Sequence, residues 1–249
     1  YLSKNYKKAR KILDYFNEED DLYYWFKIKK ETQIISKELS NKESLNFINK
    51  KFKKIKNPSI KIILDMANFN KNSKKYQNAI TYYNQIILEI DPNTNIYANI
   101  LYRRGSSHER LGNYLKSDND FLKSLEINPK DAYALNYLAY SWLERKYKIN
   151  TAIQMLEKAY ALKSNDPYII DSIGWAYYMT KDFLKAEKFL KRAVELMPND
   201  PIVNDHYGDT LWKLDRKIQA RYFWTSVLNL KDTEDKMKKN INIKLIEGL

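Results

Sequence analysis

One pattern of residues recurs about every 34 residues along most of this chain, and this period constrains the fold more than any other feature. Gly174 is followed at that spacing by Gly208, and Ala186 by Ala220. Within each unit the large apolar residues follow the spacing of an amphipathic helix. Units of this length fold as pairs of helices that stack on their neighbours, because one pair cannot bury its apolar side alone. The sequence therefore predicts an all-α solenoid of helix–turn–helix repeats.

Small residues and prolines stand where helix pairs require them. Gly174 and Ala186 are expected at the crossing of the two helices of one pair, because only a small side chain lets the backbones approach closely. Pro92, Pro129 and Pro198 each follow a predicted helix end, where a residue without a backbone N–H can end the helix without losing a hydrogen bond. Both kinds of position agree with paired helices.

The pattern resembles the tetratricopeptide repeat (TPR), which runs from a large residue through Leu-Gly, Tyr, Ala, Phe and Ala to Pro. The best copy carries Ile173, Gly174, Tyr177, Ala186, Leu190, Ala193 and Pro198. The segment Ile169–Tyr177, followed by Asn204–Asp209, is similar to bacterial multi-repeat TPR proteins. The resemblance implies a right-handed α-solenoid whose first helices line a concave groove. Five repeats are predicted, at residues 60–97, 98–131, 132–166, 167–200 and 201–232.

Both ends of the chain depart from the repeat. Residues 1–59 are predicted to hold a half repeat and two diverged TPR-like helices. Asp20 and Asp21 are expected to cap the first of these, with Ile28, Ile35 and Leu39 on its apolar face. Residues 233–249 are predicted to form a C-terminal capping helix, which makes the whole chain one continuous array. Because the chain begins without methionine and in the middle of a repeat, we expect a fragment or a processed form.

Composition excludes some classes of protein. There is no cysteine, which rules out disulfides and thiolate metal sites. No apolar run approaches the ~20 residues of a membrane-spanning helix. The net charge is +13, and residues 1–60 hold 15 Lys/Arg against 8 Asp/Glu. The lysine-rich surface expected at Lys50, Lys51, Lys53 and Lys54 is interpreted as solvated, with attraction to nucleic acid, anionic lipid or an acidic partner as the alternative.

No catalytic constellation is evident. The two histidines, His108 and His206, have no nucleophile at a suitable spacing. On a helix, Asp205 and Asp209 share a face while His206 points about 100° away, so a metal site is not expected. Motifs of phosphate-binding loops, serine hydrolases and zinc proteases are absent. The sequence therefore predicts no enzyme activity, no cofactor and no bound metal.

The resemblance to TPR proteins also indicates which side chains line the groove. In this family the second, fifth, ninth and twelfth positions of each first helix usually face the concave side. On this chain they give the predicted partner-binding residues Tyr102, Tyr133, Asn136, Tyr140, Tyr168, Asp171, Trp175, Tyr178, Asp205, Asp209 and Trp212. Aromatic side chains bring large contact area with few rotatable bonds, which favours peptide binding.

One family mechanism, the carboxylate clamp for the C-terminal acid of chaperone peptides, needs Lys, Arg and Asn in the groove. Arg110 and Asn136 would fit it. Asp171, Asp205 and Asp209 stand where further cations would help, so a basic or hydroxyl-rich partner segment is expected instead.

These observations predict a non-catalytic scaffold that binds a peptide or helix of a partner protein, with a bacterial envelope assembly as the favoured setting. RNA binding is the alternative, because basic helical-repeat proteins can bind single strands. It is disfavoured because the lysines gather at the N-terminal end while the expected groove is acidic. Similarity to bacterial TPR proteins favours the periplasm over the cytoplasm.

Overall fold

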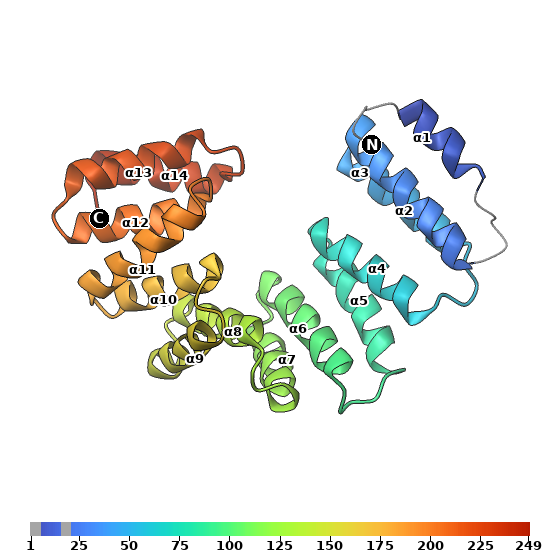
Figure 1. Cartoon of the computed structure of the whole chain (residues 1–249), viewed down its shortest axis with the longest axis horizontal. Coiled ribbons are helices and arrows are strands. Elements are labelled where there is room, and N and C mark those ends of the chain that lie inside the picture. The colour runs from blue at the N-terminus through green and yellow to red at the C-terminus, as the bar shows by residue number, and fades with distance from the viewer. Residues whose placement is uncertain (1–5, 16–20) are drawn as a thin grey trace. The chain divides into compact units, whose positions relative to one another are not determined.

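The computed structural model describes residues 6–15 and 21–249, and within these residues all regular structure is helical (Figure 1). The chain divides into two compact units, Tyr1–Ile127 and Asn128–Leu249. The all-α fold of paired helices that the period predicts is confirmed. Asp20, the expected helix cap, lies outside the described residues.

The first unit holds a short helix followed by three helix pairs. Its helices are α1 (Tyr6–Leu13), α2 (Asp21–Glu38), α3 (Asn41–Phe52), α4 (Ile60–Asn72), α5 (Tyr76–Ile87), α6 (Asn95–Arg110) and α7 (Tyr114–Ile127). Within the pairs α2 packs on α3, α4 on α5 and α6 on α7, and α5 also packs on α6. Buried Ile63, Tyr83 and Ile100 belong to one cluster that joins the α4–α5 pair to α6.

The buried side of α2 agrees with the expected one at Ile28 and differs from it at Leu39. Trp25 and Ile28 are buried, and the Trp25 indole N–H donates a hydrogen bond to Asp65 of α4 at 2.9 Å. Leu39 is 64% exposed. The prediction was wrong at Leu39 because α2 ends at Glu38, so that residue no longer follows the helical spacing.

The second unit holds three helix pairs and a last helix. Its helices are α8 (Ala132–Glu144), α9 (Ile149–Leu162), α10 (Pro167–Met179), α11 (Phe183–Leu196), α12 (Pro201–Lys213), α13 (Lys217–Asn229) and α14 (Asp235–Glu247). The first helix of each pair packs on the second, α8 and α12 both contact α10, and α14 packs on α13 (Figure 1). The first helices α8, α10 and α12 therefore form one layer.

Aspartate caps fix the start of each first helix in this unit. The side chains of Asp131, Asp166 and Asp200 accept hydrogen bonds from the backbone N–H groups two and three residues further on. Pro167 and Pro201 follow two of these caps at the first helical position, where no N–H is needed. These caps set the rotational register of α8, α10 and α12, and so the side chains that each presents.

The turns inside the pairs repeat a left-handed backbone conformation. Lys74, Gly112, Lys146, Lys181 and Asp215 have φ between 54° and 74°, and the last four follow one another at 34 or 35 residues. Positive φ at the end of a helix reverses the chain, although it is unfavourable for residues other than glycine. The left-handed turn residues therefore recur at the same spacing as the sequence repeat.

Glycines mark the helix crossings. A Cβ atom at Gly174 would lie 2.7 Å from Cγ of Leu190, and one at Gly208 would lie 2.6 Å from the Trp224 ring. Neither distance leaves room for a methyl group. The predicted role of Gly174 at a crossing is confirmed.

Candidate functional site

Aromatic rings from α8, α10 and α12 lie against one another in the second unit. The Trp175 ring stacks on Tyr178, with centroids 4.5 Å apart, and on His206, with centroids 4.0 Å apart. The Tyr140 ring lies 6.4 Å from the His206 ring. We call Tyr140, Trp175, Tyr178 and His206 the aromatic face. His206 is buried, whereas Tyr140, Trp175 and Tyr178 are partly exposed. Three of the four rings are therefore accessible to solvent, and they pack against the buried imidazole.

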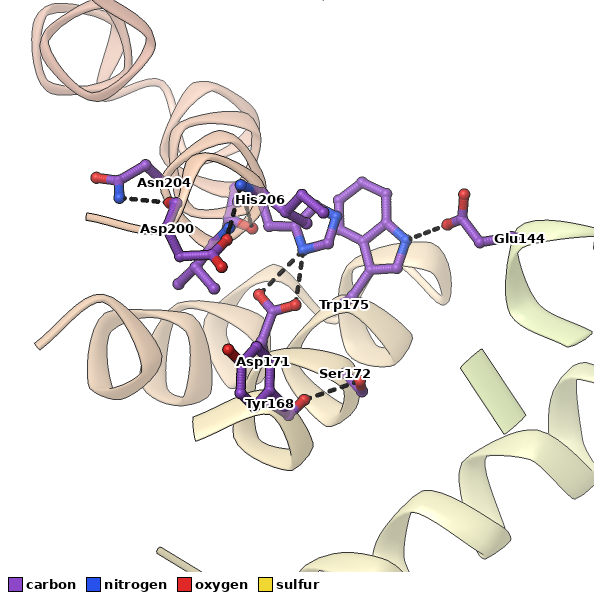
Figure 2. A network of polar contacts seen from close by, with 11 residues as sticks. Glu144, Tyr168, Asp171, Ser172, Trp175, Asp200, Asn204 and His206 are labelled. Atoms are coloured by element: carbon purple, nitrogen blue, oxygen red, sulfur yellow. Dashed lines mark hydrogen bonds and ion pairs between the residues drawn. The ribbon is translucent and has the colours of Figure 1, made fainter. Parts of the chain in front are cut away.

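Hydrogen bonds hold the central rings in place (Figure 2). The Trp175 indole N–H donates to Oε1 of Glu144 on α8 at 2.9 Å. Nδ1 of His206 lies 3.0 Å and 3.1 Å from the two carboxylate oxygens of Asp171 on α10. Figure 2 shows the indole and the imidazole side by side, each with its carboxylate. The three first helices are thereby linked through two ring nitrogens.

Asp171 and His206 form a buried pair, each side chain being 8% exposed. Burial by itself lowers the pKa of His206, but the Asp171 carboxylate, with smaller effects of Asp205 and Asp209, leaves that pKa raised. The imidazole is held toward its cationic form, in which both ring nitrogens donate. A cationic ring also strengthens the stack with Trp175.

The two aspartates in the middle of α12, Asp205 and Asp209, are paired with α14. Nζ of Lys244 lies 2.6 Å from Oδ1 of Asp205 and 2.7 Å and 2.8 Å from the two oxygens of Asp209. The Trp224 indole N–H of α13 donates to Oδ1 of Asp209 at 2.9 Å. Each of the carboxylates predicted in the groove, including Asp171, therefore has a donor within the chain itself.

The burial and the close carboxylates in this region shift the pKa values of Asp209 and Tyr178. Burial, reinforced by the neighbouring Asp205 carboxylate, raises the pKa of Asp209 to about 6, although Lys244 and His206 oppose the change. Burial together with Asp209 and Asp205 also raises the pKa of Tyr178, whose hydroxyl stays protonated. Lys244 compensates the desolvation of Asp209 only in part.

The remaining predicted residues of this unit do not belong to the aromatic face. Tyr133 and Tyr168, near the starts of α8 and α10, are exposed, and the Tyr133 hydroxyl donates to Asp166 at 3.1 Å. Oδ1 of Asn136 is buried without a hydrogen-bond partner in the described structure. Trp212 packs on Trp224, with ring centroids 5.3 Å apart.

The C-terminal backbone covers part of Trp212, since a Cβ atom at Gly248 would lie 2.1 Å from its ring. Tyr102 belongs to the first unit, where its ring makes an edge contact with Phe121 at 5.8 Å. Of the clamp candidates, Arg110 belongs to the first unit and Asn136 to the second. The structure thus brings Tyr140, Trp175 and Tyr178 together.

Three residues that form the polar contacts of this site were not among the predicted site residues. His206 follows Asp171 by 35 residues, about one repeat, so the period itself could have indicated that they are neighbours on adjacent first helices. Glu144 precedes Trp175 by 31 residues, so it lies about one helical turn beyond the position that the period makes equivalent to Trp175, and the period alone would not have indicated it. Lys244 lies in α14, outside the repeat, and no spacing pointed to it.

The described residues show no metal-binding cluster: residues 6–15 and 21–249 contain no three His, Asp or Glu side chains placed to hold an ion. His108 is buried, and desolvation lowers its pKa. In the same described part of the chain, no helix combines the length and the apolar character needed to cross a lipid bilayer.

Comparison with known sequences finds similarity to proteins with tetratricopeptide repeats. The tetratricopeptide-repeat profile matches residues 98–131. A TPR repeat-containing protein of Pseudomonas aeruginosa is 32% identical over 111 residues, which is 45% of this chain and 19% of that protein. Anaphase-promoting complex subunit 3 of Schizosaccharomyces pombe is 21% identical over 120 residues, 48% of this chain and 16% of that one. The chain thus matches less than a fifth of the length of these relatives.

Solved structures show the same fold. PilW, described as a type IV pilus biogenesis factor, superposes with a TM-score of 0.64 at 17% identity, over 77% of this chain and 86% of its own. A thermophilic TPR protein of Thermus thermophilus gives a TM-score of 0.62 at 16% identity, over 76% of this chain and 100% of its own. At such identities the likeness establishes the helical-repeat architecture.

Proposed function

We propose that this chain, whose residues 98–131 match the tetratricopeptide-repeat profile, is a non-catalytic scaffold whose aromatic face binds a segment of a partner protein. Solenoids of stacked helical repeats present extended concave surfaces that serve for binding. The observation that carries the proposal is the stack of Trp175 between Tyr178 and His206, partly exposed and hydrogen-bonded to Glu144. A rigid aromatic surface loses little conformational entropy on binding.

The partner segment that suits this face carries apolar or aliphatic side chains, with a donor group at its edge. Stacked rings offer area to aliphatic and cationic side chains. Lys244 of the chain's own α14 illustrates the chemistry, since its ammonium lies between Asp205 and Asp209 and 5.8 Å from the Trp224 ring. A lysine- or arginine-bearing helix of a partner is the proposed class of ligand.

A role in a bacterial envelope assembly is part of this proposal. It is supported by the likeness in fold to PilW, which is described as a type IV pilus biogenesis factor. Fractionation of the native cells, with the chain detected in the periplasmic or membrane fraction, supports this role. Recovery from the cytosol alone contradicts it.

The binding proposal is tested with linear peptides selected from a random displayed library on the intact chain. Truncation of Trp175 to Ala removes the centre of the aromatic face, so affinity for the selected peptides should fall about thirtyfold, the equivalent of about 2 kcal/mol. Tyr222→Ala, which removes an exposed ring of α13, is the matched control and should leave affinity within a factor of about two.

Because Trp175 also stacks on two neighbours, its truncation could lower stability. Trp175→Phe keeps a ring against Tyr178 and His206, and should keep the fold while losing the bond to Glu144 and part of the contact area. Affinity is compared for folded fractions established by circular dichroism. Peptides that bind both Trp175 variants as tightly as the unmodified chain would rule out the aromatic face.

A further inference from the structure

The first unit carries a surface of different character on its first helices α4 and α6. It is formed by Asn68 and Lys71 of α4 and by Asn99, Tyr102 and Arg103 of α6, which we call the cationic face. The Lys71 ammonium lies 5.9 Å from the centre of the Tyr102 ring. The two helices thus present a lysine, an arginine and a tyrosine, with two amides between them.

Neutral amides hold Arg103 in position. Its Nε donates to Oδ1 of Asn99 at 2.7 Å, and its Nη1 donates to Oδ1 of Asn68 at 3.0 Å. The Tyr83 hydroxyl donates to the same Asn68 oxygen at 2.9 Å. These partners orient the guanidinium without neutralising it, and its Nη2 group makes no hydrogen bond within the described part of the chain.

Lys71 is partly buried and likewise lacks an anionic partner. Among residues 6–15 and 21–249, no carboxylate forms an ion pair with Lys71 or Arg103. Burial, followed by the charges of Arg103 and Arg110, lowers the pKa of Lys71 to about 8. Two cations on adjacent helices in a partly desolvated position repel each other, and an anion between them would remove that penalty.

We propose that the cationic face binds an acidic segment of a protein partner, with Asp or Glu side chains pairing with Lys71 and Arg103. The fixed guanidinium suits the planar geometry of a carboxylate. The two cations come from different helices, so a chain that crosses α4 and α6 meets them in succession and needs acidic residues at more than one position. This site goes beyond the proposed function and uses none of its residues.

A nucleic acid fits this surface less well. Single-stranded binding needs aromatic rings on which bases can stack. The one aromatic ring of the cationic face, Tyr102, already contacts Lys71 and Phe121. Because the cationic face offers positive charge but no ring on which a base can stack, it suits the carboxylates of a polypeptide better than a nucleic acid.

The test uses the intact chain and three probes: a glutamate-rich peptide with both termini blocked, the corresponding glutamine peptide with a free C-terminal carboxylate, and a single-stranded RNA. Lys71→Met should weaken binding of the glutamate peptide by about tenfold or more, because it removes a charged partner of the carboxylates. Lys54→Met removes the same charge from an exposed position outside the cationic face and should change the affinity less than about twofold.

The pH dependence gives a second readout. Lys71 is increasingly neutral as the pH rises through about 8, so the glutamate peptide should bind less tightly at pH 9 than at pH 7. The charged groups that act on Lys71 are Arg103 and Arg110, and the Tyr102 ring lies 5.9 Å from its ammonium. Burial raises the pKa of Tyr83, which shares Asn68 with Arg103, to about 12. In Lys71→Met this loss of affinity with pH should disappear.

Loss of binding in Lys71→Met cannot be attributed to unfolding, because removal of a desolvated charge should leave the melting temperature of the chain unchanged or raise it. A thermal melt of the variant checks this. Equal affinity of the glutamate peptide for Lys71→Met and Lys54→Met overturns the proposal. So does binding of only the RNA, binding of only the glutamine peptide through its terminal carboxylate, or binding of none of the probes. Loss of peptide binding at the Trp175 variants has no bearing on these outcomes, so the two proposals fail separately.

Discussion

At the scale of single residues, the three carboxylates predicted to line the groove have partners within the chain. Asp171 pairs with His206, and Asp205 and Asp209 pair with Lys244. Each pair joins two helices, so the charge that the sequence places on first helices serves first to hold those helices together. The rings of Tyr140, Trp175 and Tyr178 remain as the exposed part of the surface, which is why the proposed binding rests on them.

The glycines at helix crossings give a prediction at the same scale. Gly174→Leu should lower the free energy of unfolding by about 3 kcal/mol, because its Cβ alone would lie 2.7 Å from Leu190 and leucine overpacks the crossing. Gly112→Leu is the matched control: no atom lies within 4 Å of its Cβ, and only the left-handed φ of 74° is unfavourable, by about 1 kcal/mol. Urea denaturation measures both, and an equal loss at the two positions would contradict the crossing assignment.

At the scale of elements, the repeat pattern predicts the helix pairs, but it predicts no contacts for the segments outside the repeats. The turns at Gly112, Lys146, Lys181 and Asp215 recur with the period, so the helix pairs could be anticipated. The same offsets applied to α4 would also have indicated Asn68 and Lys71. Helix α14 could be anticipated as an amphipathic cap but not its contacts, because nothing in the sequence places Lys244 beside Asp209. Contacts between residues that are far apart in the sequence and outside the repeats can be identified only from the three-dimensional structure.

Lys244 gives a prediction at this scale. Lys244→Met should lower the free energy of unfolding by about 2 kcal/mol or more at pH 8, because it leaves two largely buried carboxylates without their cation. The folded-state pKa of Asp209 is raised to about 6, so this carboxyl contributes stability below its unfolded value near 3.8 and loses that contribution as pH rises through 6. Without Lys244 that pKa rises further.

The loss in Lys244→Met should therefore be smaller at pH 5, where Asp209 is protonated, than at pH 8. Urea denaturation at the two pH values checks this, with Lys239→Met, an exposed lysine of the same helix, as the control. A loss of the same size at both pH values would show that Lys244 does not act through Asp209.

At the scale of the whole molecule, the two units present different chemistry on the same kind of element. The first helices α4 and α6 carry the uncompensated cations Lys71 and Arg103, whereas α8, α10 and α12 carry stacked rings over neutralised carboxylates. The net charge of +13 gave no indication of this division, because it counts residues without their pairing. A partner that binds both surfaces would combine an acidic segment with a segment that carries apolar side chains and a lysine or arginine.

The central claim, that the aromatic face is the binding surface, is tested most directly by the indole N–H resonances of the five tryptophans. In a ¹⁵N-labelled sample titrated with a selected peptide, the Trp175 resonance should shift, because the peptide covers its ring and perturbs the bond to Glu144. Trp25 and Trp142, each 2% exposed, should stay in place. A bound peptide that leaves Trp175 unchanged, or that shifts Trp142 instead, would contradict the account.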